Sequence, residues 1–115
     1  MDETQLVQRV RKELHSRGWT LCEKTHGNQF QKGWPDLFCY HPTHGCRWVE
    51  VKLPKGRLTR AQRARFKQWS GAGCGIHVIT TEKACHELLM QPGNVESWLT
   101  KGRISVSTDM RRFVK

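Results

Sequence analysis

Two short runs of aromatic and β-branched residues do most to limit the fold of this chain. They span residues 36–40 and 47–53, and the pentapeptide His41-Pro42-Thr43-His44-Gly45 joins them. Runs of this composition, separated by a few residues that include Pro and Gly, are typical of two strands that reverse on each other. The sequence therefore predicts a β-hairpin near the middle of the chain.

The rest of the chain predicts helices and further strands around this hairpin. A capping box, Thr59-Arg60-Ala61-Gln62, begins one helix, and Gly18 ends another. In chain order, the other expected elements are a helix at 3–17, a strand at 19–23, a helix from 60 to about 69, a strand at 76–80, a helix at 82–90, a helical turn at 95–99, an edge strand at 104–106 and a basic tail at 110–115. We expect a single α/β domain over 1–115, with a small mixed β-sheet flanked by helices.

Charge and composition limit the classes of partner. The 115 residues include 20 Lys or Arg against 10 Asp or Glu, a formal net charge of +10. Such an excess favours association with polyanions, so nucleic acid is the first expected partner. No apolar run approaches the roughly 18 residues that span a bilayer, and the N-terminus lacks the apolar stretch of a secretion signal. We therefore expect an intracellular protein with no membrane partner, whose five cysteines are reduced.

The hairpin carries an unusual set of charged residues. Asp36 begins its first strand, and Glu50 and Lys52 lie two apart on its second strand, which is otherwise apolar. Because side chains alternate along a strand, Glu50 and Lys52 share one face, and the reversal brings Asp36 beside them. A Glu-x-Lys triplet alone is weak evidence, since this composition produces about 0.5 of them by chance. The alternative to a functional site is that these charged residues only form a salt bridge on the surface.

At these residues the chain resembles the PD-(D/E)xK nucleases, through Gly33-Trp34-Pro35-Asp36 and Glu50-Val51-Lys52. More narrowly, it resembles the VRR-NUC (virus-type replication-repair nuclease) domains, which occur alone in phages. The narrower resemblance covers roughly residues 3–80 and rests on Glu3, the Gly-x-Pro-Asp-Leu turn, Trp48-Val49-Glu50-Val51-Lys52 and Leu58-Thr59-x-x-Gln62. It implies a restriction-endonuclease-like core of order αβββαβ and a metal-dependent DNA endonuclease, in a bacterial or phage-infected cell.

The resemblance also implies a set of site residues. Asp36, Glu50 and the backbone carbonyl of Val51 would hold Mg²⁺ or Mn²⁺, since hard cations take oxygen ligands. Lys52 would orient the attacking water and stabilise the negative charge that develops on the phosphate. Glu3 is a further expected ligand, although a Glu in the first turn of a helix is often present only because it suits the helix dipole. Glu13 is the competing acid on the same helix.

Gln62 and a basic stretch complete the expected site. At 100° per residue, Gln62 shares a helix face with Phe66 and Trp69, so its polar side chain points inward and needs a partner. The alternative is that Gln62 only completes the capping box. The basic residues expected to bind DNA phosphates are Lys55, Arg57, Arg60, Arg63 and Lys67.

Several other residues leave alternatives open. Cys39, His41, His44 and Cys46 lie close enough in sequence to hold a metal, although their spacing matches no zinc motif. His26 could approach DNA from the loop before Pro35. Trp34 either stacks on a DNA junction or caps the core. Beyond the resemblance, Val95, Trp98 and Leu99 either form a self-complementary patch for a homodimer or cap the core.

The expected substrate is branched DNA of the Holliday-junction or flap type, cut in replication, recombination or repair. A homodimer would place two sites on such a junction. One rival function is a non-catalytic basic module that binds nucleic acid, which would bind without metal and tolerate loss of Asp36 or Glu50. A second rival is a restriction-type nuclease that reads duplex sequence, but a chain of this size shows no separate recognition element.

Overall fold

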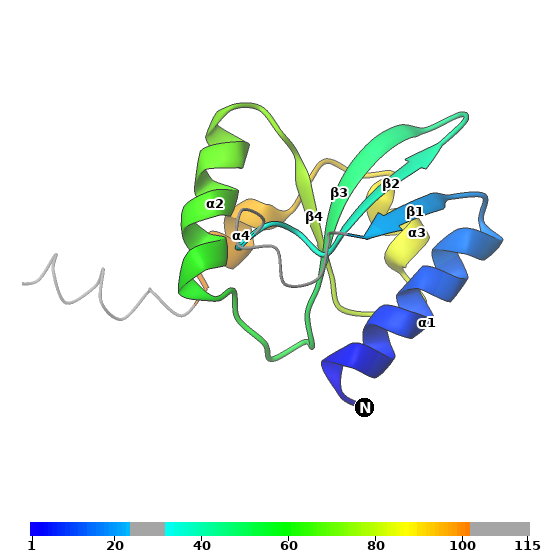
Figure 1. Ribbon diagram of the computed structural model, residues 1–115, viewed down its shortest axis with the longest axis horizontal. Helices are drawn as coiled ribbons and strands as arrows, with labels where there is room; N and C mark the ends of the chain where they lie inside the picture. Colours follow the sequence, from blue (N-terminus) through cyan, green and yellow to red (C-terminus); the bar gives the residue numbers. More distant parts are fainter. Residues whose placement is uncertain (24–31, 102–115) are drawn as a thin grey trace, which may run out of the picture.

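The computed structural model describes residues 1–23 and 32–101. The strand expected at 104–106, the tail at 110–115 and the predicted role of His26 lie outside these residues. The described elements, in chain order, are α1 (Glu3–Ser16), β1 (Thr20–Glu23), β2 (Leu37–His41), β3 (Gly45–Val51), α2 (Arg60–Gly71), β4 (Ile76–Ile79), α3 (Cys85–Leu89) and α4 (Val95–Leu99) (Figure 1).

The four strands form one mixed sheet in the order β1-β2-β3-β4. β2 pairs antiparallel with β1 and β3, whereas β3 and β4 run parallel, with Glu50 opposite Val78. A parallel pair needs a crossover connection, and α2 supplies it between β3 and β4. The expected α/β class, the mixed sheet and the predicted hairpin are therefore confirmed.

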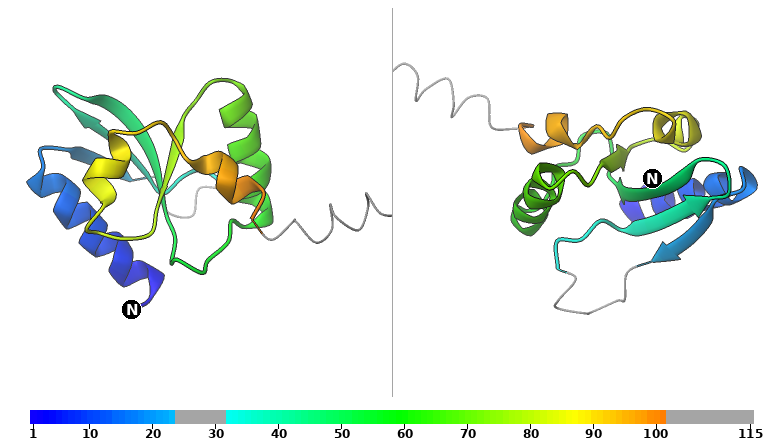
Figure 2. Two further views of the ribbon diagram at one scale, coloured as in Figure 1. Left: turned by 180° about the vertical axis from the view of Figure 1, so that it is seen from behind. Right: turned by 90° about the horizontal axis from the view of Figure 1, so that it is seen from above.

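Helices cover both faces of this sheet, as the two views in Figure 2 show. Neighbouring residues of β3 belong to different apolar clusters. Val49 packs in the cluster that contains the buried face of α1 and Leu89 of α3. Trp48 packs against the cluster formed by α2 and α4. This division follows from side-chain alternation along a strand. Residues near the carboxyl end of β3 consequently lie between the α1 side and the α2 side of the domain.

The last helix of the described residues, α4, belongs to the core. The side chains of Val95, Trp98 and Leu99 are buried and pack with Phe66 of α2. Of the two alternatives for these three residues, core capping is confirmed. The expectation that they form an exposed patch for a homodimer is wrong, because α2 already covers them.

Two element boundaries show how the structure departs from the expected ranges. The third helix spans only Cys85–Leu89, because the Thr81 hydroxyl accepts a hydrogen bond from the Ala84 backbone N–H at 3.2 Å and stabilises a turn before the helix. β3 ends at Val51 rather than residue 53, although the Lys52 N–H still donates to the Ile79 carbonyl at 3.0 Å. Within the described residues, no helix is long and apolar enough to cross a membrane.

Candidate active site

Three carboxylates from separate segments meet at one end of the sheet. Glu3 lies in the first turn of α1, Asp36 directly precedes β2, and Glu50 lies near the end of β3. One carboxylate oxygen from each residue lies within 4.8 Å of the other two. We call these three residues the acidic cluster. The helix start near the sheet is fixed by a capping box in which the Asp2 side chain accepts from the Gln5 N–H.

Reciprocal hydrogen bonds hold Asp36 and Glu50 together. The Asp36 backbone N–H donates to Glu50 Oε1 at 3.1 Å, and Asp36 Oδ2 accepts from the Val51 backbone N–H at 3.0 Å. Each carboxylate is thus bound by the backbone beside the other. Hydrogen bonds from backbone N–H groups to carboxylates are stronger than those between neutral groups, so they fix both side chains in place.

The loop that delivers Asp36 depends on a glycine. Gly33 has φ of 81°, and a Cβ atom there would lie 2.7 Å from the Ala61 carbonyl oxygen of α2. Both the positive φ and the contact with backbone require the residue that has no side chain. The Gly-Trp-Pro-Asp sequence therefore has a structural reason: it passes close to α2 and then enters β2 with Asp36 facing Glu50.

Glu50 is only 1% exposed, and two side chains compensate its burial in addition to the Asp36 N–H. Gln62 Nε2 donates to Glu50 Oε2 at 2.8 Å, and Lys52 Nζ lies 3.5 Å from the same oxygen. A buried carboxylate that lacked such partners would be strongly destabilising. Lys52 is itself only 6% exposed, so its ammonium lies inside the site rather than in bulk water.

Gln62 fulfils both of the roles that the sequence left as alternatives. Its Oε1 accepts from the Thr59 N–H at 3.0 Å while the Thr59 hydroxyl accepts from the Gln62 N–H at 3.1 Å, which completes the capping box of α2. The Nε2 of the same side chain donates a hydrogen bond to Glu50 Oε2. An amide can do both because it carries an acceptor oxygen and a donor nitrogen.

The acidic cluster fits a hard divalent cation. Three carboxylate oxygens in one cluster form the ligand type that Mg²⁺ and Mn²⁺ prefer. Three carboxylates this close repel one another unless a positive charge lies between them. Glu13, the competing acid, forms an ion pair with Arg17 at 3.0 Å, so Glu3 is the acid of α1 that lies with Asp36 and Glu50.

The alternative metal site in the hairpin is not assembled. Within the described residues, the acidic cluster is the only group of three or more potential ligands of this kind. Burial raises the pKa of the Cys39 thiol to about 12, so this residue is a protonated core thiol, whereas metals bind the thiolate. Both ring nitrogens of His41 already have backbone partners, the Arg17 carbonyl and the Thr43 N–H. All five cysteines are free, as expected.

The basic residues near the site divide into two groups. Lys55, Arg57, Arg60 and Lys67 are exposed. Arg63 is half-buried, and its guanidinium donates to the carbonyls of Leu58 at 3.4 Å and Lys101 at 3.2 Å. Arg63 therefore connects α2 to the end of α4, and its side chain is already engaged within the domain.

The structure adds one residue that sequence reasoning missed. The Lys101 ammonium donates to the carbonyls of Pro54 at 3.0 Å and Gly56 at 2.8 Å, in the loop that follows Lys52. It also lies 4.0 Å from the centre of the Trp98 ring. Lys101 thus fixes the loop between β3 and α2. No local motif marks it, because its partners are backbone carbonyls far away in sequence.

Trp34 packs edge-on against two other tryptophans. Its ring centre lies 6.2 Å from that of Trp48 and 5.4 Å from that of Trp69. This confirms that Trp34 helps to cover the core on the α2 side. Its ring remains half-buried, and stacking on DNA stays a prediction.

Comparisons with known proteins agree with this geometry. The family model described as the VRR-NUC domain matches residues 1–83, and the chain belongs to that family. A solved structure described as "VRR_NUC domain" has a TM-score of 0.63 and 19% identity, covering 77% of this chain and 95% of that one, so the two share a fold. Comparison with curated proteins gives no match. Family membership implies a nuclease-type function with a nucleic-acid substrate.

Proposed function

We propose that this protein is a Mg²⁺- or Mn²⁺-dependent endonuclease that hydrolyses phosphodiester bonds in branched DNA. The observation that carries the proposal is the acidic cluster, with oxygens of three carboxylates within 4.8 Å of one another. Asp36, Glu50, the Val51 carbonyl and Glu3 are the proposed ligands. When bound, the metal would supply a Lewis acid for the scissile phosphate and lower the pKa of a water molecule.

Lys52 and Gln62 would prepare this site for the reaction. Lys52 Nζ, 3.5 Å from Glu50 Oε2, provides a compact positive charge where negative charge develops on the phosphate, and it can orient the attacking water. Gln62 holds the Glu50 carboxylate in position through its 2.8 Å hydrogen bond. Because both residues are almost fully buried, their interactions with the reacting groups are weakly screened by solvent.

The proposal of a branched substrate rests on the charge of the exposed residues near the site. Exposed Lys55, Arg57, Arg60 and Lys67 lie on the loop after Lys52 and on α2, where they would bind phosphates without reading bases. Their contacts favour recognition of DNA shape over sequence. Symmetric cutting of a four-way junction would need two chains, and a homodimer stays a prediction. Light scattering tests it. A mass near 13.4 kDa for the free protein, together with one protein chain per junction in the DNA complex, would contradict the homodimer.

Cleavage of labelled linear, flapped and four-way DNA with Mg²⁺, Mn²⁺ or EDTA tests the function. We expect cutting of branched DNA with metal and none in EDTA. Asp36→Ala, Glu50→Ala and Lys52→Ala should each slow cleavage at least about a hundredfold, and their combination should cost little more than the worst single change. Glu87→Gln, which removes one exposed carboxylate outside the acidic cluster, is the matched control and should retain activity.

Metal binding can be measured without any substrate. Titration calorimetry should detect Mn²⁺ binding to the wild-type protein, weaker binding to Asp36→Ala and unchanged binding to Glu87→Gln. DNA that resists cleavage under every condition, together with tight DNA binding in EDTA that survives Asp36→Ala, would contradict the nuclease proposal. That result would favour the rival function of a non-catalytic DNA-binding module.

A further inference from the structure

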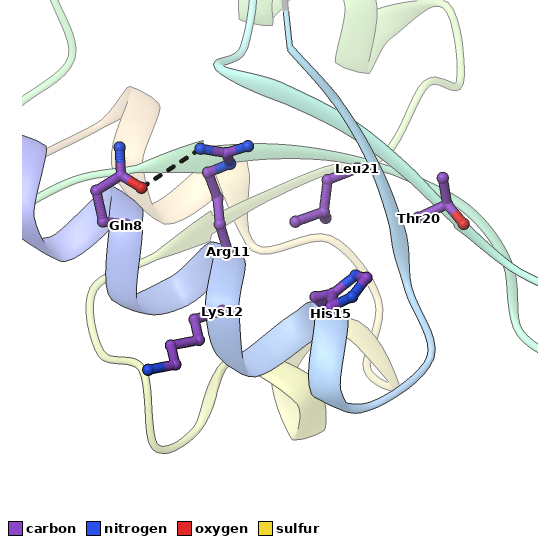
Figure 3. Close-up of a pocket in the computed structure, with 6 residues that line it drawn as sticks. All are labelled: Gln8, Arg11, Lys12, His15, Thr20 and Leu21. Carbon is purple, nitrogen blue, oxygen red and sulfur yellow. Dashed lines mark hydrogen bonds between the residues drawn. The ribbon is translucent and has the colours of Figure 1, made fainter.

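A second basic surface lies on the other side of the acidic cluster from α2. It is a groove between α1 and β1 with a volume of about 570 Å³. The groove is more open than enclosed, which suits a polymer strand that passes over it, and its volume lies within the roughly 300–1,000 Å³ range of ligand sites. We call it the α1–β1 groove; its described lining residues are Gln8, Arg11, Lys12, His15, Thr20 and Leu21 (Figure 3).

The lining of this groove suits an anion that also has an apolar part. Its described residues include Arg11, Lys12 and His15 but no Asp or Glu. Gln8 Oε1 accepts from Arg11 Nη1 at 3.4 Å, which holds the Arg11 guanidinium beside Gln8 of the same helix (Figure 3). Leu21 adds an apolar surface. Phosphate groups linked by sugars offer this combination of negative charge and apolar contact.

The neighbouring side of α1 differs in charge. There, Arg9 pairs with Glu82 at 3.3 Å and Arg17 pairs with Glu13 at 3.0 Å. Positive charge on that side is therefore matched by acids of the same domain. Lys12 lines both surfaces, but the neighbouring one also holds Glu13 and Glu82, whereas the described lining of the α1–β1 groove holds no acid. Arg9 of α1 and Arg17 at its C-cap therefore provide matched control residues.

The distance from the acidic cluster to the α1–β1 groove corresponds to a few nucleotides of a DNA strand. Glu3 of the cluster begins α1, and an α-helix rises about 1.5 Å per residue, which places the Arg11 and His15 backbones roughly 12 and 18 Å along the axis. A DNA strand advances about 3.4 Å per nucleotide along a duplex. A strand that passed the acidic cluster would reach the groove roughly four to five nucleotides later.

We propose that the α1–β1 groove binds the phosphate backbone of a DNA strand that leaves the active site. This proposal rests on the proposed nuclease function. The acidic cluster then lies between two DNA-contacting surfaces, the exposed basic residues of α2 on one side of the sheet and the groove on the other. An enzyme of this small size would thereby hold two parts of one branched substrate.

Binding of fluorescent flapped DNA in EDTA, measured by anisotropy over a range of salt concentrations, tests the groove independently of cleavage. Arg11→Gln with Lys12→Gln should weaken binding and reduce the log-affinity against log-salt slope by about 1.8, or about 0.9 per lost phosphate contact. The matched control, Arg9→Gln with Arg17→Gln, removes equal charge and should change the slope less than half as much. Lys12→Gln with His15→Gln, both exposed, provides a second test if the half-buried Arg11 proves necessary for folding.

The lengths of the DNA arms provide a second readout. The groove variants should bind DNA with arms of about two nucleotides as well as wild type does, because such arms end before the roughly four to five nucleotides estimated above. An equal loss for short and long arms, or a slope change no larger than that of the control pair, would overturn the proposal. The proposal would also be overturned if the groove variants bound phosphatidylglycerol vesicles more weakly than wild type but bound DNA with unchanged affinity. Since cleavage is not measured, an inactive but DNA-binding protein would still give a result.

Discussion

Replacing Gln62 with alanine should damage both the stability of the fold and the affinity for metal. The change removes the Nε2 donor to Glu50 Oε2 and the Oε1 acceptor for the Thr59 N–H. Glu50 would then keep its buried position with one donor fewer, while the first turn of α2 would lose half of its capping box. The two losses involve different partners, Glu50 and the Thr59 N–H, so a first estimate adds their energies.

The expected size follows from the burial of these groups. A hydrogen bond to a charged group contributes about 1.5–3 kcal/mol, and solvent screens it little here because Glu50 is 1% and Gln62 8% exposed. Loss of a helix cap costs about 1 kcal/mol. Together they predict a loss of about 2.5–4 kcal/mol, below the roughly 5–15 kcal/mol of a typical domain. The variant should fold, with a Tm lower by roughly 10–16 °C.

Urea denaturation in EDTA and calorimetric titration with Mn²⁺ separate the two roles. Thr59→Ala is the matched control: it removes the hydroxyl that caps α2 and leaves the Gln62 contact with Glu50 intact. It should cost about 1 kcal/mol of stability and leave Mn²⁺ affinity unchanged. Gln62→Ala should weaken Mn²⁺ binding about 10–100-fold, the usual effect of losing a residue that orients a ligand. If both variants lose the same stability and neither loses metal affinity, Gln62 is a helix cap only.

Three further predictions follow from other residues. Glu3→Gln should weaken Mn²⁺ binding in calorimetry, whereas Glu13→Gln should not; equal effects would remove Glu3 from the ligand set. Arg60→Ala with Lys67→Ala should lower the salt slope of DNA binding by up to about 1.8 in anisotropy and leave cleavage at saturating DNA intact. Burial lowers the pKa of His77, which bonds to the Gln91 carbonyl at 2.7 Å. Because the unfolded chain then binds more protons, the free energy of unfolding should fall as pH drops below about 6.5, and His77→Val should flatten that dependence in urea denaturation.

Local sequence signals predicted those parts of the fold that depend on neighbours along the chain. The hairpin follows from its turn residues and composition, and the start of α2 follows from the capping box at Thr59 and Gln62. The pairing of Glu50 with Lys52 follows from the two-residue period of a strand. Each of these features involves residues within a few positions of each other, where chain geometry alone restricts the outcome.

Features that depend on distant contacts could not be derived in this way. Whether Glu3 or Glu13 joins the site is decided by how α1 packs over the sheet, and local spacing treats the two acids alike. The burial of Trp98 depends on α2, more than two dozen residues earlier in the chain. The engagement of Arg63 with the Leu58 and Lys101 carbonyls has the same origin, since helical spacing correctly separated it from Gln62 but could not show what it would contact.

The arrangement around Glu50 explains why a site that is costly to build can persist without metal. A cluster of three carboxylates is destabilising by itself, and one of them is buried. Backbone N–H groups of Asp36 and Val51, the Gln62 amide and the Lys52 ammonium together compensate that charge from within the fold. These donors bind the carboxylates in fixed positions, so a cation that enters finds its ligands already oriented and loses less free energy to ordering them. The same interactions therefore stabilise the fold and would prepare the proposed metal site.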